Sequence, residues 1–206
     1  MQGITREILF NSFSESEKKK FYDFSKIIKD AYQDKKKHRA IWEYDKSIGG
    51  YGGYAAPLNP TVNPFNRLGD FRNVFRSLQY ARCDMFCCNR PRHIIMDAGL
   101  HIESLVKLLL AKNKFIKYVS EKREFGKNIS SLHEKGIIDD NLDERLNDLR
   151  RMLNLAKHDT APDRDNTFDY MDAIVFYFEV RKVGLELLKI IGDETHSKVY
   201  EIDETY

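Results

Sequence analysis

The sequence predicts an all-α protein in which a helical bundle follows an N-terminal helical extension. Apolar residues recur every three or four positions over most of the 206-residue chain, which is the spacing of one face of a helix. Hydrophobic residues make up 42% of the chain, enough for a packed core, so disorder of the whole chain is excluded. Residues 49–66 hold four of the eleven glycines and three of the five prolines, a density that neither a helix nor a central strand tolerates. We therefore expect an N-terminal helix and loop over 1–66, followed by a bundle over 67–206.

The nearly equal numbers of basic and acidic residues exclude some classes of protein. The chain has 34 Lys and Arg against 32 Asp and Glu, a formal net charge of +2. This excludes a strongly cationic DNA-coating protein but leaves room for a local basic patch. The longest aliphatic cluster, VKLLLA, is far shorter than the roughly 18 residues that a membrane-spanning helix needs, and no secretory signal is readable. We expect a cytoplasmic protein with no membrane partner.

The three cysteines suggest neither disulfides nor metal binding. Cys83, Cys87 and Cys88 lie in one short stretch, without a distant partner and without a common zinc spacing. They are best explained as small apolar residues on a helix. No metal and no cofactor is expected.

The first helix should begin at a capping box. Ser14 and Glu17 have the S-x-x-E spacing in which each side chain accepts a hydrogen bond from the other's backbone N–H. Phe21, Phe24 and Ile28 then recur at helical spacing. The pattern predicts one helix that continues through the basic cluster at residues 35–39, as far as Trp42.

A basic helix is expected over residues 67–89. The stretch 67–92 carries six arginines against two aspartates. Arg72 and Arg76 are candidate contacts to nucleic-acid phosphates, since guanidinium groups suit them. The alternative is that these arginines pair with the acidic C-terminal tail, residues 193–206.

The remaining helices are expected over about 92–112, within 114–135 before Gly136, over 142–158, and from after Thr167 to Gly192. The run AIVFYFEV in the last of these has the composition of a strand. About 24 residues without a turn signal favour a helix instead, and Gly184 within it suggests close packing.

The helix over 142–158 has two contrasting faces. At about 100° per residue, Leu142, Leu146, Leu149, Leu153 and Ala156 form one aliphatic stripe. The opposite stripe holds Asn147, Arg151, Asn154 and His158, with no acid and no lysine. A solvated surface explains such a face in most helices, and a histidine is favoured at a helix C-terminus. The absence of Glu and Lys instead favours a surface that binds phosphate or bases.

The segment LRRMLNLAKHD resembles the motif helix of HEPN domains, whose signature is Arg, four to six residues, then His. HIESLVKLLL, with Glu103 and Lys107, resembles the first core helix of that family. FGKNISSLHEKGII and FDYMDAIVFYFEVRKVGLELL are similar to its second-helix segment and its closing helix. The resemblance covers about residues 92–191 and implies an antiparallel four- or five-helix bundle.

Two registers of the motif are open. In the first, Arg151 and His158 enclose six residues and match the catalytic pair. The family usually has a polar residue after the arginine, whereas Met152 follows Arg151 here. If Asn154 fills that polar position, Leu153 takes the place of the arginine, and only Asn154 and His158 match.

The resemblance implies an RNA-binding protein, and in the first register a metal-independent endoribonuclease of a prokaryotic defence or toxin–antitoxin system. His158 would transfer protons and Arg151 would bind the phosphate. Asn147 and Asn154 would bind substrate, while Glu103 and Lys107 would orient the motif helix. A homodimer through the 142–158 helix would unite two such pairs, and an antitoxin is a possible protein partner. The alternative is a catalytically inactive helical module that binds a partner protein or a nucleotide.

Overall fold

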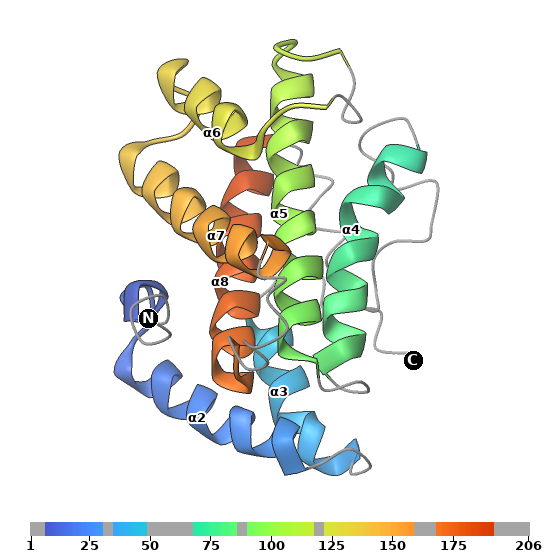
Figure 1. Cartoon of the computed structure of the whole chain (residues 1–206), viewed down its shortest axis with the longest axis vertical. Helices are drawn as coiled ribbons and strands as arrows, with labels where there is room; N and C mark the ends of the chain where they lie inside the picture. Colours follow the sequence, from blue (N-terminus) through green and yellow to red (C-terminus); the bar gives the residue numbers. More distant parts are fainter. Residues whose placement is uncertain are drawn as a thin grey trace.

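The computed structural model describes residues 7–30, 35–48, 68–85, 90–117, 122–158 and 168–191. Regular secondary structure over these residues is helical, which confirms the all-α class. The main helices are α2 (Glu15–Asp30), α3 (Lys35–Ser47), α4 (Leu68–Cys83), α5 (Pro91–Lys112), α6 (Phe125–Glu134), α7 (Asp140–His158) and α8 (Tyr170–Ile191) (Figure 1).

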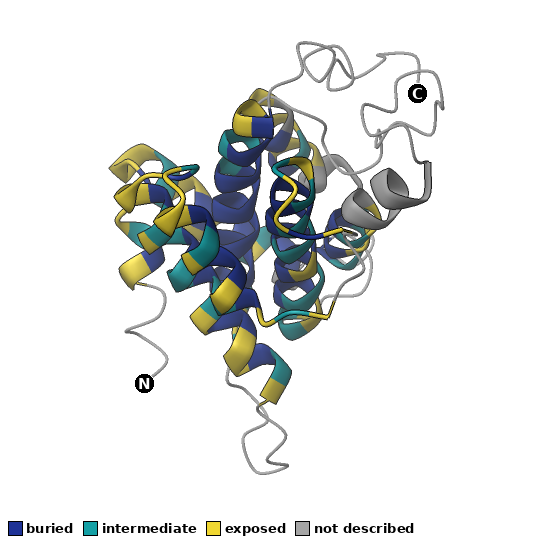
Figure 2. Cartoon of the chain, turned by 90° about the horizontal axis from the view of Figure 1, so that it is seen from above, coloured by how far each residue is buried: buried dark blue, intermediate teal, exposed yellow. Residues whose placement is uncertain are grey.

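Helix α8 forms the centre of the molecule. All of its residues from Met171 to Arg181 are buried, and α2, α5 and α7 pack against it (Figure 2). A helix that is covered on every side needs apolar residues around its whole circumference. This is why the run AIVFYFEV has the composition of a strand and is nevertheless helical, as predicted.

The arrangement around α5 is antiparallel only in part. Helix α4 runs antiparallel to α5, as expected, but α5 and α8 run in the same direction (Figure 1). The expectation of a fully antiparallel bundle is corrected here, because α7 crosses α5 and α8 obliquely instead of running alongside them. Gly184 faces α5: a Cβ added there would lie 3.4 Å from Cδ1 of Leu105 and 3.5 Å from Nε2 of His101, which are ordinary contacts, so the packing is no closer than an alanine would allow.

Residues 15–47, where one helix was predicted, form two helices. The capping box is present, since the backbone N–H of Ser14 donates to Oε2 of Glu17 (2.8 Å) and that of Glu17 donates to Oγ of Ser14 (3.4 Å). The predicted continuation to Trp42 is wrong, because α2 ends at Asp30 and α3 begins at Lys35. The ring centroids of Phe24 and Tyr44 are 5.7 Å apart. In a continuous helix these residues would be separated by about 30 Å. Two helices allow both rings to pack around Phe178 of α8.

A buried ionic cluster joins the extension to the bundle. Asp45 of α3 accepts hydrogen bonds from Nε of Arg181 (2.7 Å) and from the Tyr177 hydroxyl (3.3 Å). The same carboxylate lies 3.4 Å from Nη1 of Arg82 on α4. Arg82 is one of the six arginines of the basic stretch 67–92, and its side chain is buried and not on the helix surface. The segments 1–66 and 67–206 therefore share one core wherever both are described.

Helix α6 ends at the predicted glycine. Gly136 has a φ of +65°, and the next N–H, of Ile137, donates to the carbonyl of Leu132 (2.9 Å). A left-handed glycine with this backbone hydrogen bond is a common way to end a helix. Cys87, Cys88, the loop 49–66 and the tail 193–206 lie outside the described residues, as does the predicted pairing of the basic helix with that tail.

Candidate functional site

Helix α7 begins at a side-chain cap. The cap is Asp139, whose Oδ1 accepts a hydrogen bond from the N–H of Leu142 (2.8 Å). Asp140 and Asp143 in the first turn, and Lys157 and His158 in the last, complement the helix dipole. The start of the helix and the charges at both ends are therefore determined by local sequence.

The two faces of α7 are separated largely as predicted. The aliphatic stripe is buried, and Arg151, Asn154 and His158 are exposed on the opposite side. Arg151 and His158 lie about 20° apart around the helix axis and about 10 Å apart along it. We call Arg151, Asn154 and His158 the α7 polar face.

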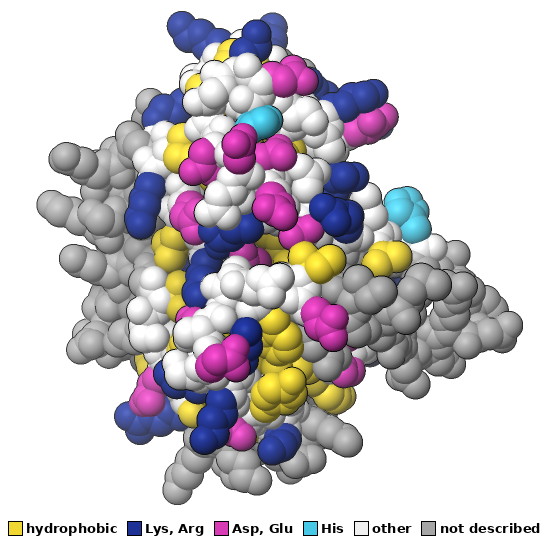
Figure 3. Space-filling model, turned by 90° about the vertical axis from the view of Figure 1, so that its left-hand side faces the viewer, with side chains coloured by type: hydrophobic (Ala, Val, Ile, Leu, Met, Phe, Trp, Pro, Cys, Tyr) yellow, Lys and Arg dark blue, Asp and Glu magenta, His cyan; other side chains and the backbone are white. Residues whose placement is uncertain are grey.

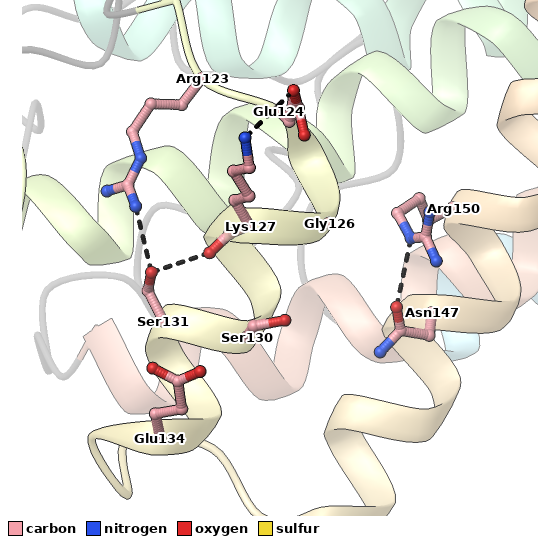
Figure 4. Close-up of a pocket in the computed structure, with 9 residues that line it drawn as sticks. All are labelled: Arg123, Glu124, Gly126, Lys127, Ser130, Ser131, Glu134, Asn147 and Arg150. Atoms are coloured by element: carbon pink, nitrogen blue, oxygen red, sulfur yellow. Dashed lines mark hydrogen bonds and ion pairs between the residues drawn. The ribbon is translucent and has the colours of Figure 1, made fainter.

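Asn147 does not share the exposure of the α7 polar face. Its Nδ2 donates to the carbonyl of Asp143 (3.0 Å), and its Oδ1 accepts from Nε of Arg150 (3.2 Å). These contacts place it in a hollow between α6 and α7, beside Gly126 and Ser130 (Figure 4). The structure thus brings Asn147 together with Arg150 and not with the predicted catalytic pair.

An acidic residue that the stripe analysis missed lies beside Arg151. Nη2 of Arg151 is 3.0 Å from Oδ1 of Asp148, although 58% of the arginine side chain remains exposed. Partial burial raises the pKa of Asp148 above its ordinary value, and the Arg151 charge opposes that rise. Any phosphate bound by Arg151 would compete with this carboxylate. The spacing of three residues between them was the available signal in the sequence.

Leu153 and Met152 are both buried, so neither belongs to the α7 polar face. Leu153 packs directly on Gly99 of α5, where a Cβ would overlap its side chain. A motif register with Leu153 in the place of the arginine therefore has no cation at that position. Arg151 is exposed, about two helical turns before His158. Of the two registers, the first has its arginine and histidine on one open face.

Three side chains fix the last turn of α7 onto α5. Nε of Arg92 donates to the carbonyl of Ala156 (2.7 Å), one of the carbonyls that the helix end leaves without an internal partner. Nζ of Lys157 donates to Oε2 of Glu103 (3.0 Å), and Lys107 lies 3.2 Å from Oε1. Burial acts to raise the pKa of Glu103, but the two lysines outweigh it and hold that pKa below its usual value. Glu103 thus contacts the helix it was expected to orient, whereas Lys107 is paired with Glu103 on α5 itself. Arg92 and Lys157 were not singled out.

The basic helix does not join this face in the described residues. Arg76 is exposed on α4, and no hydrogen bond or ion pair links it to the α7 polar face within the described ranges. The side chain of Arg72 lies outside the residues whose side chains are described. Over α6 and α7, cationic and anionic side chains are interspersed on the surface and do not form a field of one sign (Figure 3).

No group of three or more His, Cys, Asp or Glu side chains in the described part of the chain is arranged to hold a metal ion. No helix there is long and apolar enough to cross a membrane.

Comparison with known proteins gives no relative. No family model, no curated protein and no solved structure matches the chain. The resemblance to HEPN domains therefore stays a prediction from the sequence.

Proposed function

We propose that this protein is an HEPN-like RNA-binding protein whose α7 polar face cleaves RNA without a metal ion. The observation that carries the proposal is the exposure of Arg151, Asn154 and His158 on one face, at the end of a helix that Arg92 and Glu103 hold in place. A fixed cation and an imidazole that can transfer protons near neutral pH are the groups that RNA cleavage by its own 2′-hydroxyl requires.

The chemistry follows from these residues. His158 takes the proton of a ribose 2′-hydroxyl, and the 2′ oxygen attacks the adjacent phosphorus. Arg151 binds the phosphate oxygens, on which negative charge develops as the new bond forms. The bond from phosphorus to the 5′ oxygen breaks, and that oxygen receives a proton from a second acid. The products are a 2′,3′-cyclic phosphate and a free 5′-hydroxyl.

One chain supplies one such histidine, so the proposal includes a homodimer. A two-fold axis near the α7 polar face would bring a second His158 and a second Arg151 into one cleft. One imidazole then acts as base and the other as acid. Leu155, which is 48% exposed and lies beside both Arg151 and His158 on the helix surface, would be buried by such contact.

The test is cleavage of single-stranded RNA by the purified protein in EDTA. We expect cleavage to persist without divalent metal and to yield ends with a 2′,3′-cyclic phosphate or its hydrolysis product. Products with 5′-phosphates, or cleavage that requires added metal, would contradict the mechanism.

A second candidate function is a catalytically inactive module that binds a partner protein, such as an antitoxin. One observation in its favour is the ion pair between Arg151 and Asp148, because it already engages the guanidinium that a phosphate would need. The other is the exposed Leu155, an apolar side chain that a partner protein could cover. Folded, dimeric protein that leaves RNA intact would support this function over the nuclease.

A further inference from the structure

A second polar site lies between α6 and α7, outside the α7 polar face. It is an open hollow of about 480 Å³. The segment before α6 contributes Arg123, α6 contributes Lys127, Ser130 and Ser131, and α7 contributes Asn147 and Arg150 (Figure 4). Three cations, two hydroxyls and an amide from separate elements thus surround one space.

The two arginines are held by neutral groups. Nη2 of Arg123 donates to Oγ of Ser131 (3.1 Å), and Nε of Arg150 donates to Oδ1 of Asn147 (3.2 Å). Among the described residues, no carboxylate oxygen forms an ion pair with either guanidinium. Neutral acceptors orient a guanidinium without cancelling its charge, so both retain donors and positive charge for an anion.

The groups that hold the arginines are themselves fixed. Oγ of Ser131 donates to the carbonyl of Lys127 (2.7 Å), and Nδ2 of Asn147 donates to the carbonyl of Asp143 (3.0 Å). The Arg150 side chain lies across Gly126, where a Cβ would be 3.5 Å from Nε. Little rotamer entropy would then be lost when a ligand binds.

The side chains that line the hollow carry more positive than negative charge. Glu124 and Glu134 also line it, against three cations. Glu124 is paired with Lys127, with Nζ 3.2 Å from Oε1. Glu134 lies at the opposite end from Arg150, while the Ser130 hydroxyl points from α6 toward α7 (Figure 4). The space near Arg150 and Ser130 therefore offers donors without a nearby carboxylate among the residues drawn.

We propose that this hollow binds a phosphate group, through the guanidinium group of Arg150 and the Ser130 hydroxyl. Arg123 is turned toward Ser131 and away from Arg150, so it adds positive charge to the hollow without a direct contact to that phosphate (Figure 4). Planar guanidinium groups and hydroxyls are the side chains that recognise phosphate oxygens most directly. The phosphate can come from two sources, the backbone of an RNA strand or a free phosphomonoester such as a mononucleotide. The site goes beyond the proposed nuclease, since it requires neither His158 nor a second subunit.

The experiment titrates the full-length protein with inorganic phosphate and with adenosine monophosphate, followed by amide resonances in NMR. We expect saturable shifts at Gly126, Ser130 and Ser131. Arg150→Gln should weaken binding by about tenfold or more, because it removes a charged hydrogen-bond donor. Arg150→Lys should retain most of the affinity, since it keeps the charge and the stem.

Arg39→Gln is the matched control, because Arg39 is an exposed arginine on α3 that pairs with Glu43 (2.7 Å), far from the hollow in sequence. Equal weakening by this variant, or shifts that grow linearly without saturation, would mean general charge screening and would overturn the proposal. Absence of shifts at the three hollow residues would overturn it as well.

Competition identifies the source of the phosphate. If a short single-stranded RNA displaces adenosine monophosphate, the hollow takes the RNA backbone; if it does not, the hollow takes free phosphomonoesters. Both results support a phosphate site. The measurement records binding and not cleavage, so loss of the nuclease proposal would leave this one standing, and the reverse also holds.

Discussion

A buried ionic cluster is centred on Asp45, where α3, α4 and α8 meet. Its carboxylate contacts Arg82 and Arg181, and the side chains of all three are 2–3% exposed. Nearby negative charge and burial also raise the pKa of Tyr177, whose hydroxyl donates to the same carboxylate. Two cations thus depend on one anion inside the protein, where an unpaired charge is costly.

Removal of that anion should destabilise the fold strongly. We expect Asp45→Ala to lower the free energy of unfolding by about 3–5 kcal/mol, because two buried guanidinium groups lose their shared carboxylate. Urea denaturation measures the change. Asp23→Ala, at an exposed aspartate 3.9 Å from Lys26, should change stability by less than about 0.5 kcal/mol. Similar losses in both variants would mean that the cluster adds nothing specific.

The sequence could not reveal this cluster. Arg82 occurs in a run of evenly spaced arginines, and nothing local separates it from Arg76, which is exposed. Its burial depends on Asp45 and Tyr177, which lie far away in the chain. Asn147 bonds to Asp143 and Arg150 of its own helix, and the hollow in which it lies also requires α6, which the pattern of α7 alone does not reveal.

At the scale of the elements, Glu17 connects three helices. It completes the capping box of α2, accepts a hydrogen bond from the Tyr44 hydroxyl of α3 (2.8 Å), and pairs with Lys182 of α8 (2.8 Å). Burial acts to raise its pKa, but Lys182, Ser14 and Tyr44 outweigh burial and lower the pKa from 4.5 to about 2.

This pKa predicts how stability depends on pH. The unfolded chain binds a proton at Glu17 below about pH 4.5, whereas the folded chain does so only near pH 2, so stability from Glu17 is present above pH 4.5 and lost as the pH falls toward 2. We expect Glu17→Gln to be less stable than the wild type by about 1–2 kcal/mol at pH 7, reduced by solvent screening. Denaturation between pH 7 and 2 should show this difference disappear at the acidic end; a constant difference would contradict the assignment.

The contact between α5 and α7 depends on a glycine. Leu153 occupies the space where Gly99 lacks a side chain. We expect Gly99→Ala to destabilise the protein by about 1–3 kcal/mol, because Leu153 is buried and must move. Gly126→Ala is the matched control, since its Cβ would make only ordinary contacts and alanine favours a helix. Thermal unfolding should therefore shift in opposite directions for the two variants.

Sequence motifs predicted helix boundaries and helix type well where these depend on residues close together in the chain. The capping box at Ser14, the glycine at 136 and the unbroken apolar run of α8 each identified a helix boundary or type correctly. The break between α2 and α3 was missed because no Gly or Pro marks it, and tertiary packing of Phe24 and Tyr44 requires it. The parallel direction of α8 and α5 was also missed. It depends on how α7, which comes between them in the chain, crosses the bundle, and the spacing of apolar residues within a helix does not reveal that crossing.

At the scale of the whole molecule, the proposed dimer should depend on Leu155. It is the exposed apolar residue of α7, surrounded by the α7 polar face. We expect Leu155→Glu to convert the dimer to a monomer, because the two-fold contact would bring two carboxylates together. Sedimentation at micromolar concentration measures this. Tyr80→Glu, at an exposed tyrosine of α4, should leave the dimer intact. A wild type that is monomeric would contradict the arrangement.

The central claim, that the α7 polar face is a nuclease site, is tested most directly by cleavage of single-stranded RNA with matched variants. The account predicts that His158→Ala and Arg151→Ala lower the rate by about 10²–10⁴ in EDTA while the protein stays folded and dimeric. His133→Ala and Arg39→Ala, which remove an exposed histidine of α6 and an exposed arginine of α3, should retain wild-type rates. Equal rates in all five proteins, including no cleavage by any of them, would contradict the claim.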